Sequence, residues 1–316
     1  MQTIVTDSAE EAAKILNSGG VVAFPTETVY GLGAGIYCAD AIRQVFCAKG
    51  RPGDNPLIVH IYSIEQLGDV AGDINSGAQK LIEQFFPGPL TLVLKKNPQI
   101  PDSVTAGLDT VGVRCPLNPV AREFLRRCSG PVAAPSANLS GLPSATRWET
   151  VYGDLHGKID CVLRGEPSSI GLESTIIDCS GSVPTLLRAG AITLEQLRAV
   201  LPEIRLNVPA ADEEKVPKCP GLKYPHYAPK ATVLLCEGNE KIIVGPSSGY
   251  IGLSKPPEGA LVVKVCSNLE EYGRELFSFF RRCDAEGIKV IYCELPSNKG
   301  IGRAIRDRLL RASGKD

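Results

Sequence analysis

The 316-residue chain carries 34 Lys and Arg residues against 35 Asp and Glu residues, which gives a net charge of −1. Hydrophobic residues make up 43% and charged residues 22%, the balance of a globular protein, and this excludes a disordered chain. The near-neutral charge and the lack of a polybasic tract leave little support for electrostatic binding of nucleic acid. The length exceeds one typical domain, so we expect one large and one small domain.

Membrane insertion and disulfide bonding also find no support in the sequence. No apolar run approaches the ~20 residues that a membrane span requires, and residues 1–7 lack the basic and apolar regions of a signal peptide. The 11 cysteines include no C-x-x-C pair, so we expect reduced, mostly buried thiols rather than a zinc site or a disulfide framework. We therefore expect a cytoplasmic protein without membrane contacts.

The chain begins with a predicted helix and a predicted buried strand. Ser8 and Glu11 have the spacing of a capping box, which predicts a helix that continues to Leu16. The apolar residues 21–24 lie between glycine and proline and predict a strand. The polar residues and glycines of 26–33 then predict a loop that holds a ligand, although an ordinary connection remains the alternative.

Three basic side chains follow the next predicted elements. A helix over 39–48 ends in a turn with Lys49 and Arg51, where Lys49 could simply favour the negative end of the helix dipole. His60 interrupts the predicted strand 57–61 and, taken alone, is interpreted as a core histidine. Arg114 lies on the predicted strand 110–116, where its guanidinium requires an anionic partner from a ligand or a salt bridge.

The remaining elements of the first domain repeat the pattern of a strand followed by a polar loop. The predicted strand 131–135 runs into Ser136, Asn138 and Ser144, which form a second loop of the ligand-binding type. Further helices are predicted over 76–86, 118–128 and 193–201, and further strands over 90–94, 161–163, 174–179 and 185–188.

A proline-rich stretch separates this domain from a smaller one. Residues 206–230 contain five prolines after position 208 and predict an extended linker. Because the linker carries Tyr224, His226 and Tyr227, we expect it to cover a bound ligand. Beyond it, strands over 233–236, 261–265 and 290–293 and helices over 269–282 and 301–311 predict a small Rossmann-like α/β unit with mostly parallel strands.

The candidate side chains of the first domain combine cations with small polar groups. They are Lys49, Arg51, Arg114 and Arg188 together with Ser136, Asn138 and Ser174. This combination predicts a site for a polyanion. Neither a Walker lysine motif nor a complete dinucleotide glycine motif is present, since Gly300-Ile-Gly302 lacks the third glycine. We therefore expect catalysis by positioning and charge stabilisation.

Several motifs, in the same order along the chain, resemble those of the threonylcarbamoyl-adenylate synthases. They are Pro25-Thr-Glu-Thr-Val-Tyr-Gly-Leu-Gly33, Lys49-Gly-Arg-Pro52, Asn55-Pro-Leu57, Pro87-Gly-Pro-Leu-Thr91, Val113-Arg-Cys-Pro116, Ser136-Ala-Asn138 and Leu172-Glu-Ser-Thr-Ile176. The resemblance implies a YrdC-like α/β domain over 1–205, with a twisted open mixed sheet and helices. It also implies a linker or lid over 206–230 and the C-terminal domain of the long form over 231–316.

The resemblance implies a reaction and its partners. Such an enzyme is a nucleotidyltransferase that joins L-threonine, bicarbonate or carbon dioxide, and ATP into threonylcarbamoyl-AMP and pyrophosphate, with magnesium. The product feeds the threonylcarbamoyl modification of adenosine beside the anticodon in tRNA. A separate protein complex carries out that modification, so tRNA or this complex are possible partners.

The resemblance also assigns residues. The signature residues implied to be catalytic are Lys49, Arg51, Ser136 and Asn138. Those implied to surround L-threonine are Thr28, His60, Arg114, Ala134 and Ser174. Those implied to contact ATP are Arg51, Asn55, Thr110, Ser136, Ser144, Arg188 and Tyr224. The metal ligands are unknown. The C-terminal domain matches the family loosely apart from residues 300–305 and the following helix, which leaves its role open.

Two alternatives remain. The last predicted helix presents Arg303, Arg306, Arg308 and Arg311, which could bind RNA on a YrdC-like fold, or could simply form a solvated helix face. Carbamoyl transfer, as in hydrogenase-maturation proteins that share this domain, is disfavoured because the chain has no acylphosphatase or zinc-finger region.

Overall fold

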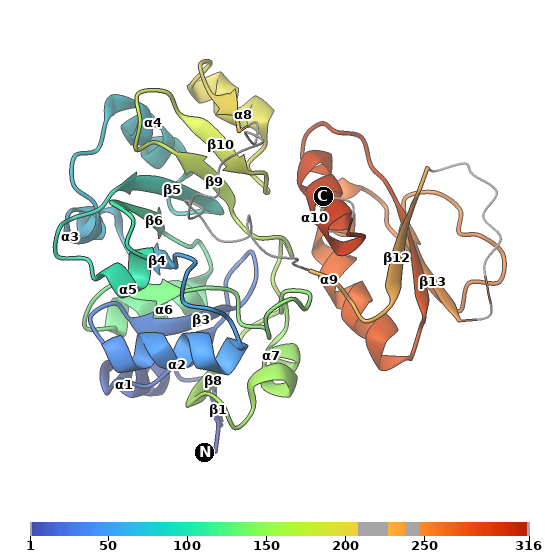
Figure 1. The fold of residues 1–316 in the computed structure, drawn as a ribbon, viewed down its shortest axis with the longest axis horizontal. Coiled ribbons are helices and arrows are strands. Elements are labelled where there is room, and N and C mark those ends of the chain that lie inside the picture. The colour runs from blue at the N-terminus through green and yellow to red at the C-terminus, as the bar shows by residue number, and fades with distance from the viewer. Residues whose placement is uncertain (1, 208–226, 238–244, 246, 315–316) are drawn as a thin grey trace.

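The computed structural model describes residues 2–207, 227–237, 245 and 247–314. The described residues form an 11-stranded sheet in a large N-terminal domain and a 4-stranded sheet in a smaller domain. The two domains lie side by side (Figure 1). No helix in these described ranges is long and apolar enough to cross a bilayer.

The large sheet is mixed, as predicted. In spatial order its strands are β1 (Ile4–Thr6), β8 (Cys161–Leu163), β2 (Val22–Phe24), β3 (Gly31–Gly35), β7 (Val132–Ala134), β4 (Ile58–His60), β6 (Thr110–Arg114), β5 (Leu90–Lys95), β9 (Thr175–Asp178), β10 (Thr185–Arg188) and β11 (Arg205–Leu206). β2 pairs in parallel with β8 and antiparallel with β3, and β4 pairs in parallel with β6 and antiparallel with β7.

Helices cover both faces of this sheet. Side chains alternate between the faces along a strand, so Val22 and Phe24 of β2 pack on one side while Val21 and Ala23 pack on the other. The first side is covered by α1 (Ala9–Asn17) and α6 (Pro119–Arg127). The other side is covered by α2 (Ala39–Lys49), α4 (Ser76–Phe85), α7 (Trp148–Leu155) and α8 (Leu194–Val200). Shorter helices are η1 (Ile64–Gln66), α3 (Leu67–Val70) and α5 (Asp102–Thr105).

The helix ends follow the capping signals in the sequence. The Ser8 hydroxyl accepts a hydrogen bond from the Glu11 amide at 3.2 Å, and α1 begins at the next residue. The predicted capping box is not completed, because the Ser8 amide donates to Thr6 Oγ1, which in turn donates to Glu11 Oε2. Thr193 and Gln196 form a reciprocal capping box at the start of α8. The sequence therefore located these helices to within a residue or two.

The polar loop predicted over 26–33 is shorter than expected, because its glycines form strand β3. A Cβ on Gly31 would lie 2.9 Å from the Phe24 ring, and one on Gly33 would lie 2.8 Å from Val132. The glycines thus permit neighbouring side chains to pack tightly over the strand, rather than giving a loop its flexibility. The short elements β1, α7 and β11 were also not predicted.

The C-terminal sheet has the order β12 (Thr232–Cys236), β15 (Val290–Glu294), β13 (Ser248–Gly252) and β14 (Val262–Val265), and all of its pairings are parallel, as predicted. β13 was not predicted. The helices α9 (Leu269–Ala285) and α10 (Gly302–Ala312) lie on the side of this sheet that faces the large domain (Figure 1).

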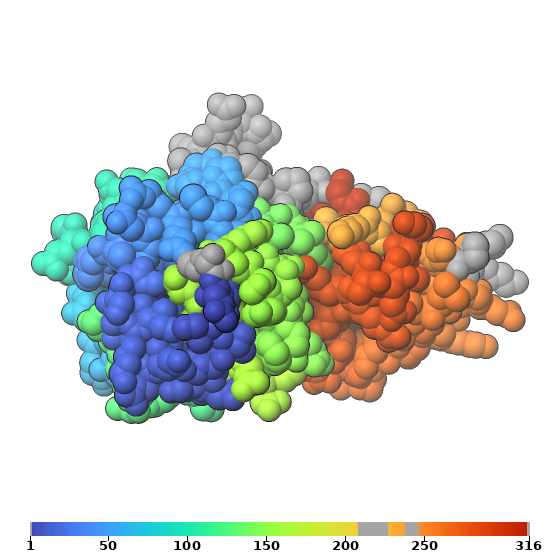
Figure 2. Space-filling view, turned by 90° about the horizontal axis from the view of Figure 1, so that it is seen from below, coloured from blue at the N-terminus to red at the C-terminus, as the bar shows by residue number. Residues whose placement is uncertain are grey.

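The two domains share a hydrophobic cluster. Val29 and Leu172 of the large domain belong to the same core cluster as Tyr272 and Phe277 of α9. A Cβ on Gly171, whose φ is +78°, would lie 2.5 Å from the Cα of Arg274, so only glycine permits this close approach. Figure 2 accordingly shows the orange C-terminal domain packed directly against green segments of the large domain.

The linker prediction lies mostly outside the described residues. β11 still pairs with β10 in the large sheet, and β12 begins the small sheet. Residues 208–226, which include Tyr224 and His226, are not described. The domain limits and the role of the linker as a lid therefore stay predictions.

The predicted surface of four arginines on the last helix is wrong. Arg308 is 0% exposed, and Arg311 pairs with Asp307 within α10. Helical spacing explains the error, because Arg308 falls on the same face as the buried Ile305 and Ala312. α10 thus directs one of its arginines inward, which removes the main observation behind an RNA-binding face.

The described cysteines are all free thiols, most of them buried. Cys219 lies outside the described residues. Within the described part of the chain, no three His, Cys, Asp or Glu side chains form a group that could hold a metal ion.

Candidate active site

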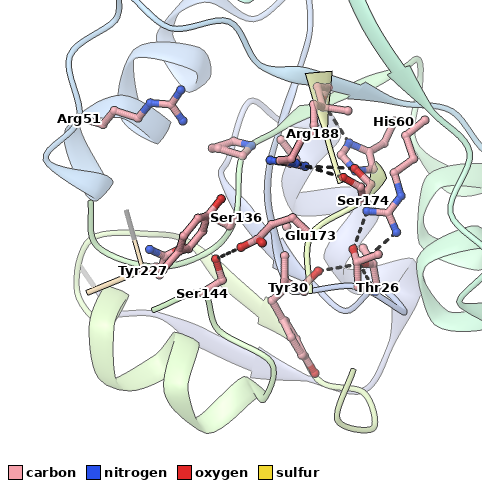
Figure 3. A pocket seen from close by; sticks show the side chains of 18 of the residues that line it. Thr26, Tyr30, Arg51, His60, Ser136, Ser144, Glu173, Ser174, Arg188 and Tyr227 are labelled. Atoms are coloured by element: carbon pink, nitrogen blue, oxygen red, sulfur yellow. Dashed lines mark hydrogen bonds between the residues drawn. The ribbon is translucent and has the colours of Figure 1, made fainter. Parts of the chain in front are cut away.

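A cavity with about 650 Å³ of empty space, part of it open to solvent, lies where the polar ends of several central strands meet. Its wall is formed by the β2–β3 loop, the ends of β4, β6, β9 and β10, and the segment after β7 (Figure 3). The lining residues are Thr26, Thr28, Val29, Tyr30, Gly31, Arg51, Ile58, His60, Arg114, Ala134, Pro135, Ser136, Asn138, Leu142, Ser144, Glu173, Ser174, Arg188 and Tyr227.

Arg114 is held at one end of the cavity by the β2–β3 loop. Its Nη1 donates to Thr28 Oγ1 at 2.7 Å and its Nη2 donates to Glu27 Oε1 at 2.7 Å. The second Glu27 oxygen accepts the backbone amides of Leu117 and Asn118 at 3.2 and 3.3 Å. Burial acts to raise the pKa of Glu27, but Arg114 outweighs it and the net pKa is lowered, so this is a true ion pair.

His60 lies beside this cluster as a neutral ring. Burial, and then the charge of Arg114, lowers the pKa of His60 to about 3. Its Nδ1 is 3.1 Å from the carbonyl oxygen of Ile58, and the ring packs edge-on against Phe24 at a centroid distance of 5.6 Å. His60 is therefore both a packed core residue and a polar group of the cavity wall.

Ser174 and Arg188 form a second polar pair in the wall. Arg188 donates from Nε to the carbonyl oxygen of Ser174 at 3.1 Å and from Nη2 to its hydroxyl at 3.2 Å. The same hydroxyl lies 2.7 Å from that of Thr91 on β5. These contacts fix the Arg188 guanidinium at the cavity.

Lys49 takes a different place from the one predicted. It is buried at the end of α2, and its Nζ donates to the carbonyl oxygens of Ser136 and Asn138, the latter at 2.6 Å. It is not among the residues that line the cavity. Lys49 thus holds the loop that carries Ser136 and Asn138, and does not itself project into the cavity.

Arg114 and Asn138 in the wall each have one buried polar atom without a hydrogen-bond partner among the described residues. These atoms are Nε of Arg114, a donor, and Oδ1 of Asn138, an acceptor. The Asn138 amide nitrogen is used elsewhere, since it donates to the carbonyl oxygens of Leu139 and Leu142. Buried polar atoms are rarely left unpaired, so both atoms are candidates for ligand contacts.

Ser136, Ser144 and Tyr227 line the opposite side of the cavity, and Arg51 lies further out on that side (Figure 3). The Ser144 hydroxyl donates to Glu173 Oε1. Tyr227 is buried and stacks on Phe277 at a ring distance of 5.3 Å. The cavity therefore has one end rich in hydrogen-bonded groups around Arg114 and another formed by Arg51 and hydroxyl groups.

Most of the sequence-predicted site residues come together. The cavity is lined by Thr28, Arg51, His60, Arg114, Ala134, Ser136, Asn138, Ser144, Ser174 and Arg188, but not by Lys49, Asn55 or Thr110. Thr110 begins the strand that ends at Arg114, about 13 Å away at the usual rise per residue. Asn55 is fully buried. Tyr224 lies outside the described residues.

The sequence analysis did not assign Glu173 to the site, and it included Tyr30 and Tyr227 only as members of the predicted polar loop and of the linker. The sequence could have pointed to Glu173, because a carboxylate next to the apolar run of β9 requires a cation as its partner. Tyr30 uses its hydroxyl to bond the backbone of Gly165, so its role in the wall is to pack. Tyr227 was expected only in general terms, as one of the linker aromatics.

Two carboxylates in or beside the cavity are each paired with an arginine. Glu173 lines the cavity and is paired with Arg308, and Glu27, which is not among the lining residues, is paired with Arg114. Among the described residues, no group of three His, Cys, Asp or Glu side chains could hold a metal ion at the cavity.

The mixed α/β sheet, with arginines, hydroxyls and a neutral histidine around a cavity at its strand ends, is typical of the class of enzymes that hold anionic substrates with positioned cations.

Comparison with known proteins narrows this class to one family. Residues 14–190 match the family described as "Telomere recombination", and residues 192–314 match "Threonylcarbamoyl-AMP synthase, C-terminal domain". The chain belongs to the threonylcarbamoyl-AMP synthase family. The threonylcarbamoyl-AMP synthase of Pyrococcus abyssi is 44% identical, with 96% of this chain and 93% of the relative covered. That of Bacillus subtilis is 43% identical, with 96% and 92% covered. The crystal structure of P. abyssi Sua5 complexed with L-threonine superposes with a TM-score of 0.91 at 40% identity, over 99% of this chain and 97% of that one.

Proposed function

We propose that this chain is an enzyme that makes threonylcarbamoyl-AMP and pyrophosphate from L-threonine, bicarbonate or carbon dioxide, and ATP. The observation that carries the proposal is the near-complete match, in sequence and in fold, to a relative of that name and to its complex with L-threonine. The cavity has the groups that such substrates require, namely guanidinium groups for carboxylate and phosphate and hydroxyls for hydrogen bonds.

We assign L-threonine to the Arg114 end of the cavity. The guanidinium is already oriented by Glu27 and Thr28, and its Nε remains available to a carboxylate oxygen. The neutral His60 adds a polar group without adding charge, and Ser174 and the backbone of Ala134 complete this end. A fixed guanidinium loses little side-chain entropy on binding, which favours affinity.

We assign ATP to the Arg51 end. Arg51 lines the cavity and is 7% exposed, so its charge acts in a partly desolvated site where Coulomb interactions are strong. Ser136 and Ser144 supply hydroxyls, and Arg188, which donates to Ser174 of the Arg114 end, adds a further cation to the wall. The assignment of Asn55 and Thr110 to ATP contacts would require these residues to act from outside the cavity wall.

The chemistry then proceeds in two balanced steps. The threonine amine adds to carbon dioxide, losing a proton, and gives a carbamate; from bicarbonate the same step releases water. A carbamate oxygen then attacks the α-phosphorus of ATP, while the bond to the β-phosphate oxygen breaks and pyrophosphate leaves. This is nucleotidyl transfer without a covalent enzyme intermediate, and it relies on positioning and on cations near the leaving group.

Magnesium fits best as part of the nucleotide substrate. Since Glu27 and Glu173 are each paired with an arginine, the triphosphate itself would supply most of the ligands of the ion. The ion would neutralise charge on the phosphates during transfer.

The product is a reactive mixed anhydride that a later enzyme must consume. We propose that it serves the threonylcarbamoyl modification of adenosine next to the anticodon in tRNA, with transfer by a separate complex. The resemblance to the family supports this placement.

The test is pyrophosphate release from ATP by the full chain. We expect release to require both threonine and bicarbonate, and to fall sharply when serine replaces threonine. A rate that does not depend on threonine or bicarbonate would contradict the proposed function. Binding of tRNA with a steep salt dependence, without any such turnover, would favour the RNA-binding alternative.

Substitution of Arg114 should affect threonine more than ATP. We expect Arg114→Lys, which keeps the charge but loses the bidentate fork, to raise the KM for threonine about tenfold or more, with a much smaller change in the KM for ATP. Steady-state kinetics with each substrate varied in turn measure this.

Arg126→Gln provides the control, because Arg126 pairs only with Glu123 on the surface of α6 among the described residues. Equal changes in both KM values for Arg114→Lys would place Arg114 at the phosphates instead.

A further inference from the structure

The last helix of the C-terminal domain places a fully buried arginine against the wall of the active site. Arg308 of α10 is 0% exposed. Its Nε donates to Glu173 Oε2 at 2.9 Å, and its Nη2 donates to the carbonyl oxygen of Ala189 at 3.1 Å. Both acceptors belong to the large domain, so the arginine crosses the boundary between the domains. Its Nη1 is bonded to Asp307 of the same helix at 2.6 Å.

Glu173 connects this arginine to the cavity. The carboxylate oxygen Oε2 accepts the hydrogen bond from Arg308. The other oxygen, Oε1, accepts the hydrogen bond from the Ser144 hydroxyl (Figure 3). Glu173 and Ser144 both line the cavity. A continuous chain of contacts therefore leads from α10 through Glu173 to a residue assigned to ATP.

The charge of Glu173 requires compensation at this position. Burial acts to raise the pKa of Glu173, but Arg308 and then Arg188 outweigh it, and the net pKa is lowered. The group is thus a buried carboxylate in the wall of a site proposed to bind a triphosphate. Without a cation against it, it would repel the phosphates in a region of low dielectric.

Other contacts of the C-terminal domain reach the same part of the wall. Arg281 of α9 donates to the carbonyl oxygen of Pro143, next to Ser144, at 2.6 and 3.1 Å. It also forms a bidentate pair with Asp154 at 2.8 and 2.7 Å. The loop that carries Ser144 is therefore held by the C-terminal domain from two directions.

Tyr227 adds a third contact. Its ring lies under the Arg308 guanidinium at 5.4 Å and stacks on Phe277 of α9, while the residue also lines the cavity. Its φ of 69° lies in the left-handed region that non-glycine residues rarely adopt, so packing must hold it there. α9 and α10 provide that packing.

We propose that Arg308 is a positioning residue for the ATP end of the active site. It neutralises Glu173 and holds it against Ser144, so that the C-terminal domain completes the nucleotide half of the cavity. This inference rests on the proposed function for the identity of the nucleotide, and it gives the C-terminal domain a role in catalysis by the other domain.

The test compares Arg308→Gln, Glu173→Gln and the double variant in the full-length protein. We expect Arg308→Gln to raise the KM for ATP about tenfold or more, while the KM for threonine changes less than about threefold. We expect the double variant to recover most of the loss, because it leaves neither charge buried without its partner. Titration calorimetry without threonine measures the dissociation constant of ATP directly. We expect this constant to rise in Arg308→Gln and to return toward the wild-type value in the double variant.

The matched control is Arg306→Gln on the same helix, since Arg306 donates to the carbonyl oxygen of Pro296 within the C-terminal domain. It should leave both KM values near those of the wild type. If Arg308→Gln does not fold, Arg308→Lys is tested instead. We then expect a smaller rise in the KM for ATP and no rise in the KM for threonine.

Two results would overturn the inference. The first is an unchanged KM for ATP in Arg308→Gln or its replacement, or equal rises in the KM for ATP and the KM for threonine. Either outcome would mean that Arg308 only holds the two domains together. The second is a double variant as impaired as Arg308→Gln. A wild-type chain that binds ATP but shows no threonine-dependent pyrophosphate release would refute the proposed function instead, and the ATP dissociation constants would still decide the role of Arg308.

Discussion

Replacement of Lys49 by Met is expected to reduce both turnover and stability. Methionine cannot donate to the carbonyl oxygens of Ser136 and Asn138, which lie in a part-buried and a buried position, and it leaves both acceptors without this hydrogen bond. We expect the free energy of unfolding to fall by about 2–4 kcal/mol. Because a misplacement of about 1 Å in a positioned site can cost about 100-fold in rate, kcat should fall by at least that factor. Denaturant unfolding and the pyrophosphate assay measure the two effects.

Lys14→Met is the control for this substitution, because Lys14 is exposed and pairs only with Glu10 on α1 among the described residues. It should change stability by less than about 0.5 kcal/mol and leave kcat unaltered. If Lys49→Met lost turnover but kept the full free energy of unfolding, Lys49 would act on the substrate directly, although its side chain lies outside the cavity wall.

The pH dependence of the free energy of unfolding tests independently whether burial lowers the pKa of Lys49. Burial, and then the charge of Arg51, lowers the pKa of Lys49 to about 7. An unfolded chain, with a lysine pKa of about 10.4, binds more protons than the folded one between these two values, so the contribution of Lys49 to stability rises with pH. The stability difference between wild type and Lys49→Met should therefore widen above about pH 7, by up to about 1.4 kcal/mol per unit. A constant difference up to about pH 9 would contradict the lowered pKa.

Local signals in the sequence were enough to locate most elements of the fold. Caps, prolines and apolar runs act within a few residues, which is why α1, α8 and the central strands lie close to their predicted limits. β3 was not recognised because its glycines resemble a loop until the Phe24 ring and Val132 are seen packed over them. Its structure depends on tertiary contacts that no local pattern encodes.

The candidate site could be predicted as a set of residues but not as a set of interactions. Arg114 was expected to need an anion, and the structure provides Glu27, which is 87 residues away in the chain. Lys49 was expected to face a ligand, but its side chain is taken up by carbonyl groups almost ninety residues further on. Residue type identifies the chemistry available, whereas the partner of each charge follows only from the fold.

Arg308 shows the same limit most clearly. Its helix was interpreted as a basic surface, although the arginine lies on the apolar face with Ile305 and Ala312. An arginine on such a face signals a buried partner, and helical spacing alone could have raised that question. The identity of the partner, Glu173, required the docking of one domain on the other.

Replacement of Arg51 by Ala is expected to reduce turnover strongly while affecting stability less than Lys49→Met does. Arg51 lines the cavity at the end assigned to ATP, so we expect its charge to act on the phosphates of the bound nucleotide. Loss of one such preorganised group typically costs about 100- to 1000-fold in kcat, or about 3–4 kcal/mol of transition-state stabilisation.

The comparison of Arg51→Ala with Lys49→Met separates the roles of the two cations that flank Gly50. For Arg51→Ala, single-turnover rates of threonylcarbamoyl-AMP formation at saturating ATP should fall with most of the unfolding free energy retained; for Lys49→Met the rate and the unfolding free energy should fall together. Arg51→Lys should restore part of the rate, since a charge without the fork still attracts the leaving pyrophosphate. A near-normal rate for Arg51→Ala would mean that cations other than Arg51 stabilise the leaving group, and the assignment of ATP to this end of the cavity would then be wrong.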